Sequence, residues 1–106
     1  MASQGISVNV EKDRATVRLD GEHEAYTADK LSRHVTALLS EGVPVTVDLR
    51  HAAFIDSTVI GVLLAANNRA NAAGLEFVLL LGEETGWPVR RMLDVTGLRS
   101  QFEVVG

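Results

Sequence analysis

The chain has 106 residues, 46% of them hydrophobic and 23% charged, which is typical of one globular domain, here residues 1–106. It contains no cysteine, so disulfide bonds and thiolate metal sites are excluded. The formal net charge is −4 and the one basic pair is Arg90-Arg91, which argues against direct nucleic-acid binding because that requires a concentrated basic patch.

The first half of the chain predicts a hairpin, a helix and a buried strand. Apolar residues alternate over residues 5–20 on both sides of a turn, and this pair of strands should end at Gly21 and Glu22. Thr27 fits the N-cap of a helix that Gly42 ends. The β-branched run of residues 43–49 then predicts a strand covered on both faces.

The second half predicts helices that alternate with strands. Residues 50–54 show no element of their own, and residues 58–73 are rich in Ala, Leu and Val, as expected of a helix closed by Gly74. Residues 77–81 predict a second buried strand. Pro88 suits the start of a short helix, and a last edge strand should follow near residues 102–105. This alternation indicates an α/β fold in which the helices pack on a mostly buried sheet.

The segment Asp56-Ser57 lies between a predicted strand and a predicted helix N-terminus. Such a place gathers unpaired backbone N–H groups and the positive end of the helix dipole, so a phosphate on a serine there would find donors. Asp and Ser are also common helix caps, and capping alone would explain both residues.

Two faces of the helix over residues 58–73 are apolar. One stripe suits the core and contains Val59, Val62, Leu63, Ala66, Ala70 and Ala73. The other side carries small and aliphatic residues, including Ile60, Gly61 and Leu64. This second face could receive a partner protein, or it could be wedged between two elements of the same domain.

The remaining polar constellations do not predict a catalytic or metal site. His23, His34 and His51 lack metal-ligand spacing, and we expect them to be solvated surface residues. Ser57, Asp56 and His51 are residue types found in hydrolases, but no Gly-x-Ser-x-Gly elbow is present. We therefore expect no enzyme activity, no cofactor and no small-molecule substrate.

Three blocks of the sequence resemble the STAS-domain anti-sigma-factor antagonists of bacteria, also called anti-anti-sigma factors. The blocks are residues 19–22 with 27–31, residues 47–61 around Phe54-Ile55-Asp56-Ser57-Thr58, and residues 89–98. They stand in register and span nearly the whole chain. The resemblance implies a single STAS-like domain, with a mixed β-sheet and helices packed mainly on one face.

By this resemblance the protein is a phosphoprotein that regulates transcription by partner switching. Ser57 aligns with the family's phosphoacceptor, with Thr58 as the fallback. The partner is a serine-kinase anti-sigma factor, which releases its sigma factor on binding, and a matching phosphatase reverses the modification. The partner-binding surface comprises Glu24, Thr27, Asp56, Ser57, Thr58, Ile60, Gly61 and Leu64.

One departure from the family pattern concerns the first turn of this helix. Val59 stands where the family usually has glycine, and its branched side chain could fill space that a kinase loop needs. An alternative is therefore the STAS subunit of a bacterial lipid-transport ABC complex, which would bind an ATPase subunit without a phosphate cycle. An enzyme using Ser57 is a more remote alternative.

The sequence also bears on location. The first ten residues lack the basic and apolar run of a signal peptide, and no apolar stretch approaches membrane-spanning length. We therefore expect a cytoplasmic protein without a membrane partner.

Overall fold

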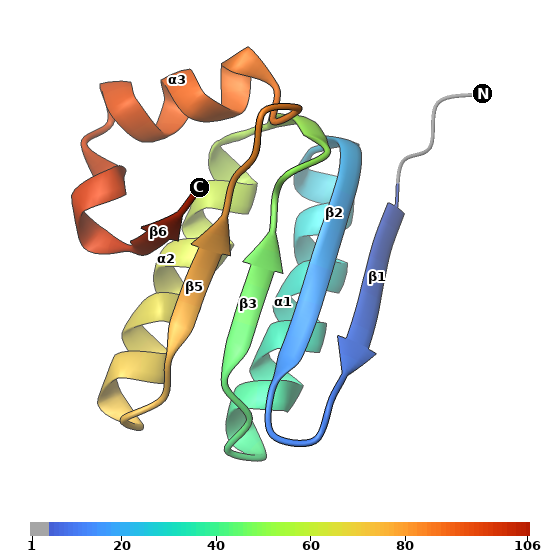
Figure 1. Ribbon diagram of the computed structural model, residues 1–106, viewed down its shortest axis with the longest axis vertical. Coiled ribbons are helices and arrows are strands. Elements are labelled where there is room, and N and C mark those ends of the chain that lie inside the picture. The colour runs from blue at the N-terminus through green and yellow to red at the C-terminus, as the bar shows by residue number, and fades with distance from the viewer. Residues whose placement is uncertain (1–4) are drawn as a thin grey trace.

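The computed structural model describes residues 5–106, which form a mixed β-sheet with three α-helices (Figure 1). The six strands are β1 (Gly5–Val10), β2 (Ala15–His23), β3 (Val45–Asp48), β4 (Ala52–Ile55), β5 (Phe77–Leu80) and β6 (Glu103–Val105). The sheet order is β1-β2-β3-β5-β6, and β4 pairs with β2. β1 is antiparallel to β2, whereas the other pairs are parallel. The mixed sheet is therefore confirmed.

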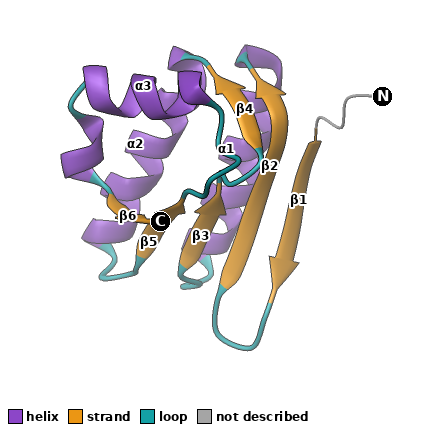
Figure 2. Cartoon of the chain, turned by 45° about the horizontal axis from the view of Figure 1, so that its top comes forward, coloured by secondary structure: helices purple, strands orange, loops and turns teal. Residues whose placement is uncertain are grey.

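The helices cover the sheet mainly from one side, as predicted. α1 (Ala25–Ser40) and α2 (Ser57–Ala72) lie side by side behind the strands in Figure 1. α3 (Trp87–Val95) crosses the end of the molecule and contacts β4 (Figure 2), and a short 3-10 turn, η1 (Leu98–Gln101), leads into β6.

The core forms where alternate residues of β2 meet the apolar stripe of α1. The period of two in the strand and the period near 3.6 in the helix direct these side chains inward. The residues are Ala15, Val17 and Leu19 in β2 and Leu31, Val35 and Leu39 in α1, each no more than 4% exposed. Burial of one such Leu or Val side chain contributes about 1.5–3 kcal/mol relative to exposure.

β2 is longer than predicted. Gly21 and Glu22, expected to end the hairpin, lie inside the strand, which continues to His23. Gly21 adopts a positive φ of 81°, and the register with β4 shifts between these two residues. The bulge lets the strand bend and exchange its neighbour β3 for β4 without ending.

β4 itself was not predicted. Its four residues follow a tight turn in which the buried Asp48 carboxylate accepts bonds from the backbone N, Nε and Nη2 of Arg50 at 3.0, 3.0 and 2.9 Å. Burial raises the pKa of Asp48, but hydrogen bonds from Arg50 and the charges of Arg50 and Arg18 lower it to a net value below the ordinary one. The ionised Asp48 and Arg50 hold the turn that brings the chain back to the edge of β2.

α1 begins earlier than predicted. Its N-cap is Glu24 rather than Thr27, and the Glu24 side chain makes no capping hydrogen bond. Thr27 lies inside the first turn, where its hydroxyl donates to the carbonyl oxygen of Glu24 at 3.0 Å. The expected C-terminal caps are confirmed: Gly42 and Gly74 follow α1 and α2 with φ of 78° and 72°, a conformation that glycine adopts without steric cost.

Candidate functional site

The pairing of β2 with β4 brings two predicted site segments together at one edge of the molecule. His23 is opposite Ile55 in this parallel pair, and the backbone N of Asp56 donates to the carbonyl oxygen of His23 at 3.2 Å. Glu24 and Asp56, which follow these strands, are the N-caps of α1 and α2. Two helix N-termini therefore lie beside each other. We call Glu24, Thr27 and residues 56–58 the helix-start surface.

Asp56 holds the first turn of α2. One of its carboxylate oxygens accepts bonds from the backbone N of Thr58 at 3.0 Å, from that of Val59 at 3.1 Å and from the Thr58 hydroxyl. The Thr58 hydroxyl is the main cause that lowers the pKa of Asp56. Burial opposes it, and the backbone N–H groups of Val59, Thr58 and Ala25 lower the pKa further. A negative charge is thus stabilised at the start of both helices.

Ser57 has a different role from Asp56. It is the first residue of α2, its side chain is exposed, and within residues 5–106 its hydroxyl makes no hydrogen bond. Capping therefore explains Asp56 but not Ser57. The Thr58 hydroxyl is also exposed but donates to Asp56, so Ser57 has the less engaged hydroxyl of the two.

Ile60 does not lie on a partner surface as predicted. It is only 6% exposed and belongs to the hydrophobic core. The amide of Asn67, two turns further along, donates to the carbonyl oxygen of Gln101 at 2.8 Å. For Ile60, the interpretation of a helix wedged within its own domain is correct.

For the other residues of α2, the observed burial agrees only in part with the predicted partner and core faces. Gly61 is exposed, and a Cβ built on it would meet no atom within 4 Å. Leu64 is half-buried against the core. Among the predicted core residues, Leu63 is fully buried, whereas Val62 is half-buried and Ala73 is exposed. Gly61 and Leu64 therefore extend the helix-start surface along α2.

Val59 does not obstruct that surface. Its side chain is 1% exposed and packs in the core. The Val59 side chain therefore fills space beneath the helix rather than at its outer face. Val59 does not occupy space that a partner would need on the exposed side of α2.

His23 was expected at the surface but is 1% exposed. Its Nε2 lies 2.8 Å from the carbonyl oxygen of Asp20, and its Nδ1 has no hydrogen-bond partner among the described residues. The neighbouring Glu22 and Glu24 suggested a solvated segment, but β2 continues through this point and turns His23 inward. A longer alternating pattern from Ala15 would have indicated this.

The other histidines do not assemble a catalytic or metal site around Ser57. His51 is half-buried with its Nε2 3.4 Å from a carboxylate oxygen of Glu84, and His34 is exposed. Within residues 5–106, no group of three His, Cys, Asp or Glu side chains could hold a metal ion. No helix in the same range has the length and apolar character needed to cross a membrane.

Comparison with known proteins defines the class. The family model described as "Mlab, STAS domain" matches residues 6–105, so the chain belongs to the STAS-domain family. It is 30% identical over 104 residues to the anti-sigma-B factor antagonist of Listeria monocytogenes, covering 93% of this chain and 88% of the relative. The chain belongs to the anti-sigma-factor antagonist family, whose members are regulators rather than enzymes.

Solved structures agree with this fold. An anti-sigma factor antagonist from Mycobacterium paratuberculosis superposes with a TM-score of 0.81 at 22% identity, covering 97% of this chain and 86% of that one. The Bacillus cell fate determinant SpoIIAA, in its phosphorylated form, gives a TM-score of 0.74 at 16% identity, covering 96% and 92%.

Proposed function

We propose that this anti-sigma-factor antagonist binds a serine-kinase anti-sigma factor through the helix-start surface and is switched off by phosphorylation of Ser57. The observation that carries the proposal is the exposed, unengaged hydroxyl of Ser57 directly after the capping residue Asp56. The relative in Listeria is an anti-sigma-B factor antagonist, and a Bacillus relative exists in a phosphorylated form. The protein acts in the cytoplasm, where a phosphatase restores the binding form.

The geometry supports a switch that acts through charge. Asp56 already occupies the backbone N–H groups of Thr58 and Val59, so these donors are not vacant for a phosphate on Ser57. A phosphate would add about −1.5 to −2 charges beside an ionised carboxylate. In the free protein this charge stays in water near the favourable end of the helix dipole.

Binding of a partner removes that water. Desolvating an anion without a matched cation costs several kcal/mol, and every 1.4 kcal/mol changes an affinity by about tenfold. Phosphorylation therefore releases the partner without a rearrangement of the antagonist. The same charge argument predicts that Asp at position 57 is a weaker switch, because it carries about half the charge.

The partner face also includes the exposed side of α2. Gly61 leaves the helix backbone open to close approach, and Leu64 offers an aliphatic contact at the edge of the core. An apolar contact surrounded by a polar, solvent-accessible rim is the usual arrangement of a protein–protein interface.

The test is phosphorylation by an anti-sigma factor captured with this protein from its native cell. Incubation with that partner and ATP should add one phosphate, and peptide mass spectrometry should locate it on Ser57. Thr58→Val should be modified as the wild type is, whereas Ser57→Ala should not be modified although it still binds. Phosphate on another residue would refute the proposed switch. A stable complex with a transporter ATPase and no phosphate would establish the transport-subunit alternative instead.

A further inference from the structure

A groove runs between α1 and α2, away from the helix-start surface. It encloses about 340 Å³, within the range of small-molecule sites. It begins at Val62, five residues after Ser57, or about 7.5 Å along the helix at 1.5 Å per residue. The lining residues are Ser32, Val35, Thr36, Val62, Ala65, Ala66 and Arg69.

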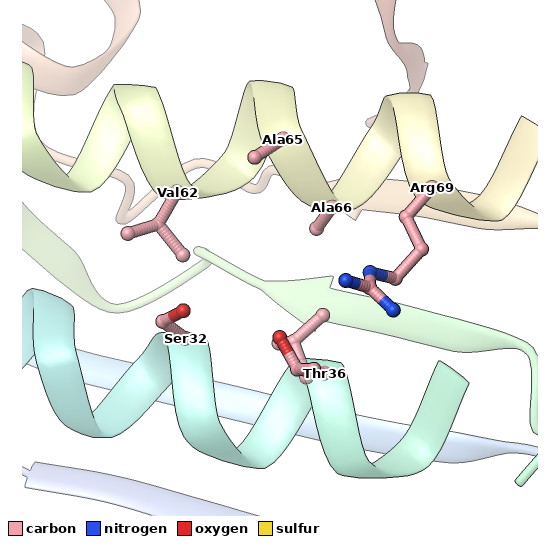
Figure 3. Close-up of a pocket in the computed structure, with 7 residues that line it drawn as sticks. Ser32, Thr36, Val62, Ala65, Ala66 and Arg69 are labelled. Atoms are coloured by element: carbon pink, nitrogen blue, oxygen red, sulfur yellow. The ribbon is translucent and has the colours of Figure 1, made fainter. Parts of the chain in front are cut away.

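Polar groups from both helices converge on this groove. Ser32 and Thr36 are four residues apart on α1 and so share one face of it. In Figure 3 both rise toward α2, and the guanidinium of Arg69 bends over the groove toward Thr36. The groove therefore has two hydroxyls on one wall and a cation on the other.

Arg69 differs from the other arginines within residues 5–106. Each of the others contacts a carboxylate, a carbonyl oxygen or an aromatic ring, and these are Arg14, Arg18, Arg33, Arg50, Arg90, Arg91 and Arg99. Among the same described residues, the Arg69 guanidinium makes no hydrogen bond or ion pair. Its five donors are available to a ligand.

The floor of the groove is aliphatic. Val35 and Ala66 are 1% and 7% exposed, and Val62 is half-buried beside them. From Val62 to Arg69 the groove extends about 10 Å along α2 at the helical rise of 1.5 Å per residue. Val35 and Ala66 close the base of the groove, and the accessible apolar surface is that of Val62 and the exposed Ala65; a short hydrocarbon chain would lie against these two residues, with its charged end at Arg69.

We propose that this groove binds a small amphipathic carboxylate. A planar carboxylate matches the fork of a guanidinium with two parallel hydrogen bonds, and the hydroxyls of Ser32 and Thr36 supply further donors. A single negative charge suits a site with one cation in a protein of net charge −4, whereas a polyanion would be repelled. The proposal does not depend on phosphorylation of Ser57.

The experiment uses hexanoate as the probe and the full-length protein labelled with nitrogen-15. Titration should give saturable amide shifts at Ser32, Thr36 and Ala65, with a dissociation constant of about millimolar order, as expected for a ligand of this size. Hexanol, which has the same chain without the charge, should bind at least tenfold more weakly. Inorganic phosphate can also pair with the guanidinium but lacks the hydrocarbon chain, so it should compete more weakly than hexanoate.

Two variants and a control decide the role of the cation. Arg69→Gln should weaken hexanoate binding at least tenfold, because it removes a charge-assisted contact. Thr36→Val removes one hydroxyl with little change of shape and should weaken binding several-fold. Arg33→Gln, at an exposed arginine of α1 already paired with Asp29, should bind as the wild type does. Thermal melts confirm that each variant is folded.

The proposal is wrong if hexanoate shifts no groove residue, or if hexanol binds equally well. It is also wrong if folded Arg69→Gln retains wild-type affinity. Competition by phosphate that matches hexanoate would overturn the assignment of a carboxylate.

Discussion

Replacement of Gly61 by alanine should raise stability and weaken partner binding at the same time. Gly61 lies inside α2, is exposed, and has open space where a Cβ would stand. Alanine in a helix interior is favoured over glycine by about 0.8–1.0 kcal/mol. A domain of this size gains about 4–8 °C in melting temperature per kcal/mol, so the Gly61→Ala variant should melt about 3–8 °C higher.

Although Gly61→Ala should raise stability, it should lower the affinity for the partner. If the partner's backbone approaches α2 at Gly61, the new methyl group overfills that contact. Overpacking of a close contact costs about 1–3 kcal/mol, which corresponds to an affinity lower by roughly 5- to 160-fold. Calorimetric melts and a binding titration with the anti-sigma factor measure the two effects separately.

Ser40→Ala is the matched control, since Ser40 is exposed in the last turn of α1, far from the helix-start surface. It should raise stability by a few tenths of a kcal/mol and leave binding unchanged. A lower melting temperature for Gly61→Ala would contradict the open space found at this position. Unchanged binding would remove Gly61 from the proposed interface.

Three further predictions test the packing and the electrostatics of the fold. Leu63→Ala should lower stability by about 2–5 kcal/mol, because it leaves a cavity in the core. Leu64→Asp, at a half-buried position, should lower stability less but weaken partner binding more. If thermal melts show the larger loss of stability for Leu64→Asp, the two faces of α2 are misassigned. Gly86→Ala should cost about 1–3 kcal/mol, because its Cβ would overlap the β4 backbone, and a wild-type urea midpoint would contradict this. Because folding lowers the pKa of Asp48, its ionised carboxylate stabilises the fold at a pH above about 3.9, the pKa of Asp in the unfolded chain. This contribution is lost as the pH falls through the lower pKa of the folded state. Asp48→Asn should therefore be less stable than wild type at about pH 7, and the gap should narrow toward about pH 3; a constant gap would refute the linkage.

The sequence predicted elements well where one face of a segment is buried. The alternation in β2 and the helical stripe in α1 both depend on local periodicity, and both were located correctly apart from their ends. β4 was missed for a physical reason. Its four residues are short and have no simple alternation of buried and exposed positions, and they form a strand only because a bulge at Gly21 lets β2 accept them.

The site was harder to predict because it depends on contacts distant in sequence. The pattern around Ile60 showed that α2 has a second apolar face, but it could not show that Ile60 is buried within the domain. The bond from Asn67 to Gln101 spans 34 residues. Local patterns located Asp56 at the start of the helix. They could not show which of Asp56 and Ser57 caps the helix, since that depends on which side chain accepts from the first backbone N–H groups.

The groove illustrates the same limit. Arg69 lies seven residues after Val62 and therefore on the same side of α2, which the sequence alone could have shown. The hydroxyls of Ser32 and Thr36 face it only because of how α1 is rotated against α2, and that rotation is a property of the packed domain.

The proposed switch depends on the charge that Ser57 carries. The affinity of the captured anti-sigma factor should be measured for the antagonist with unmodified Ser57 and for the antagonist with phosphoserine installed at that position. We expect equal melting temperatures within a few degrees, because the phosphate remains in solvent, and an affinity at least a hundredfold lower, corresponding to about 2.7 kcal/mol of uncompensated desolvation. Equal affinities for the two forms would contradict the proposed switch.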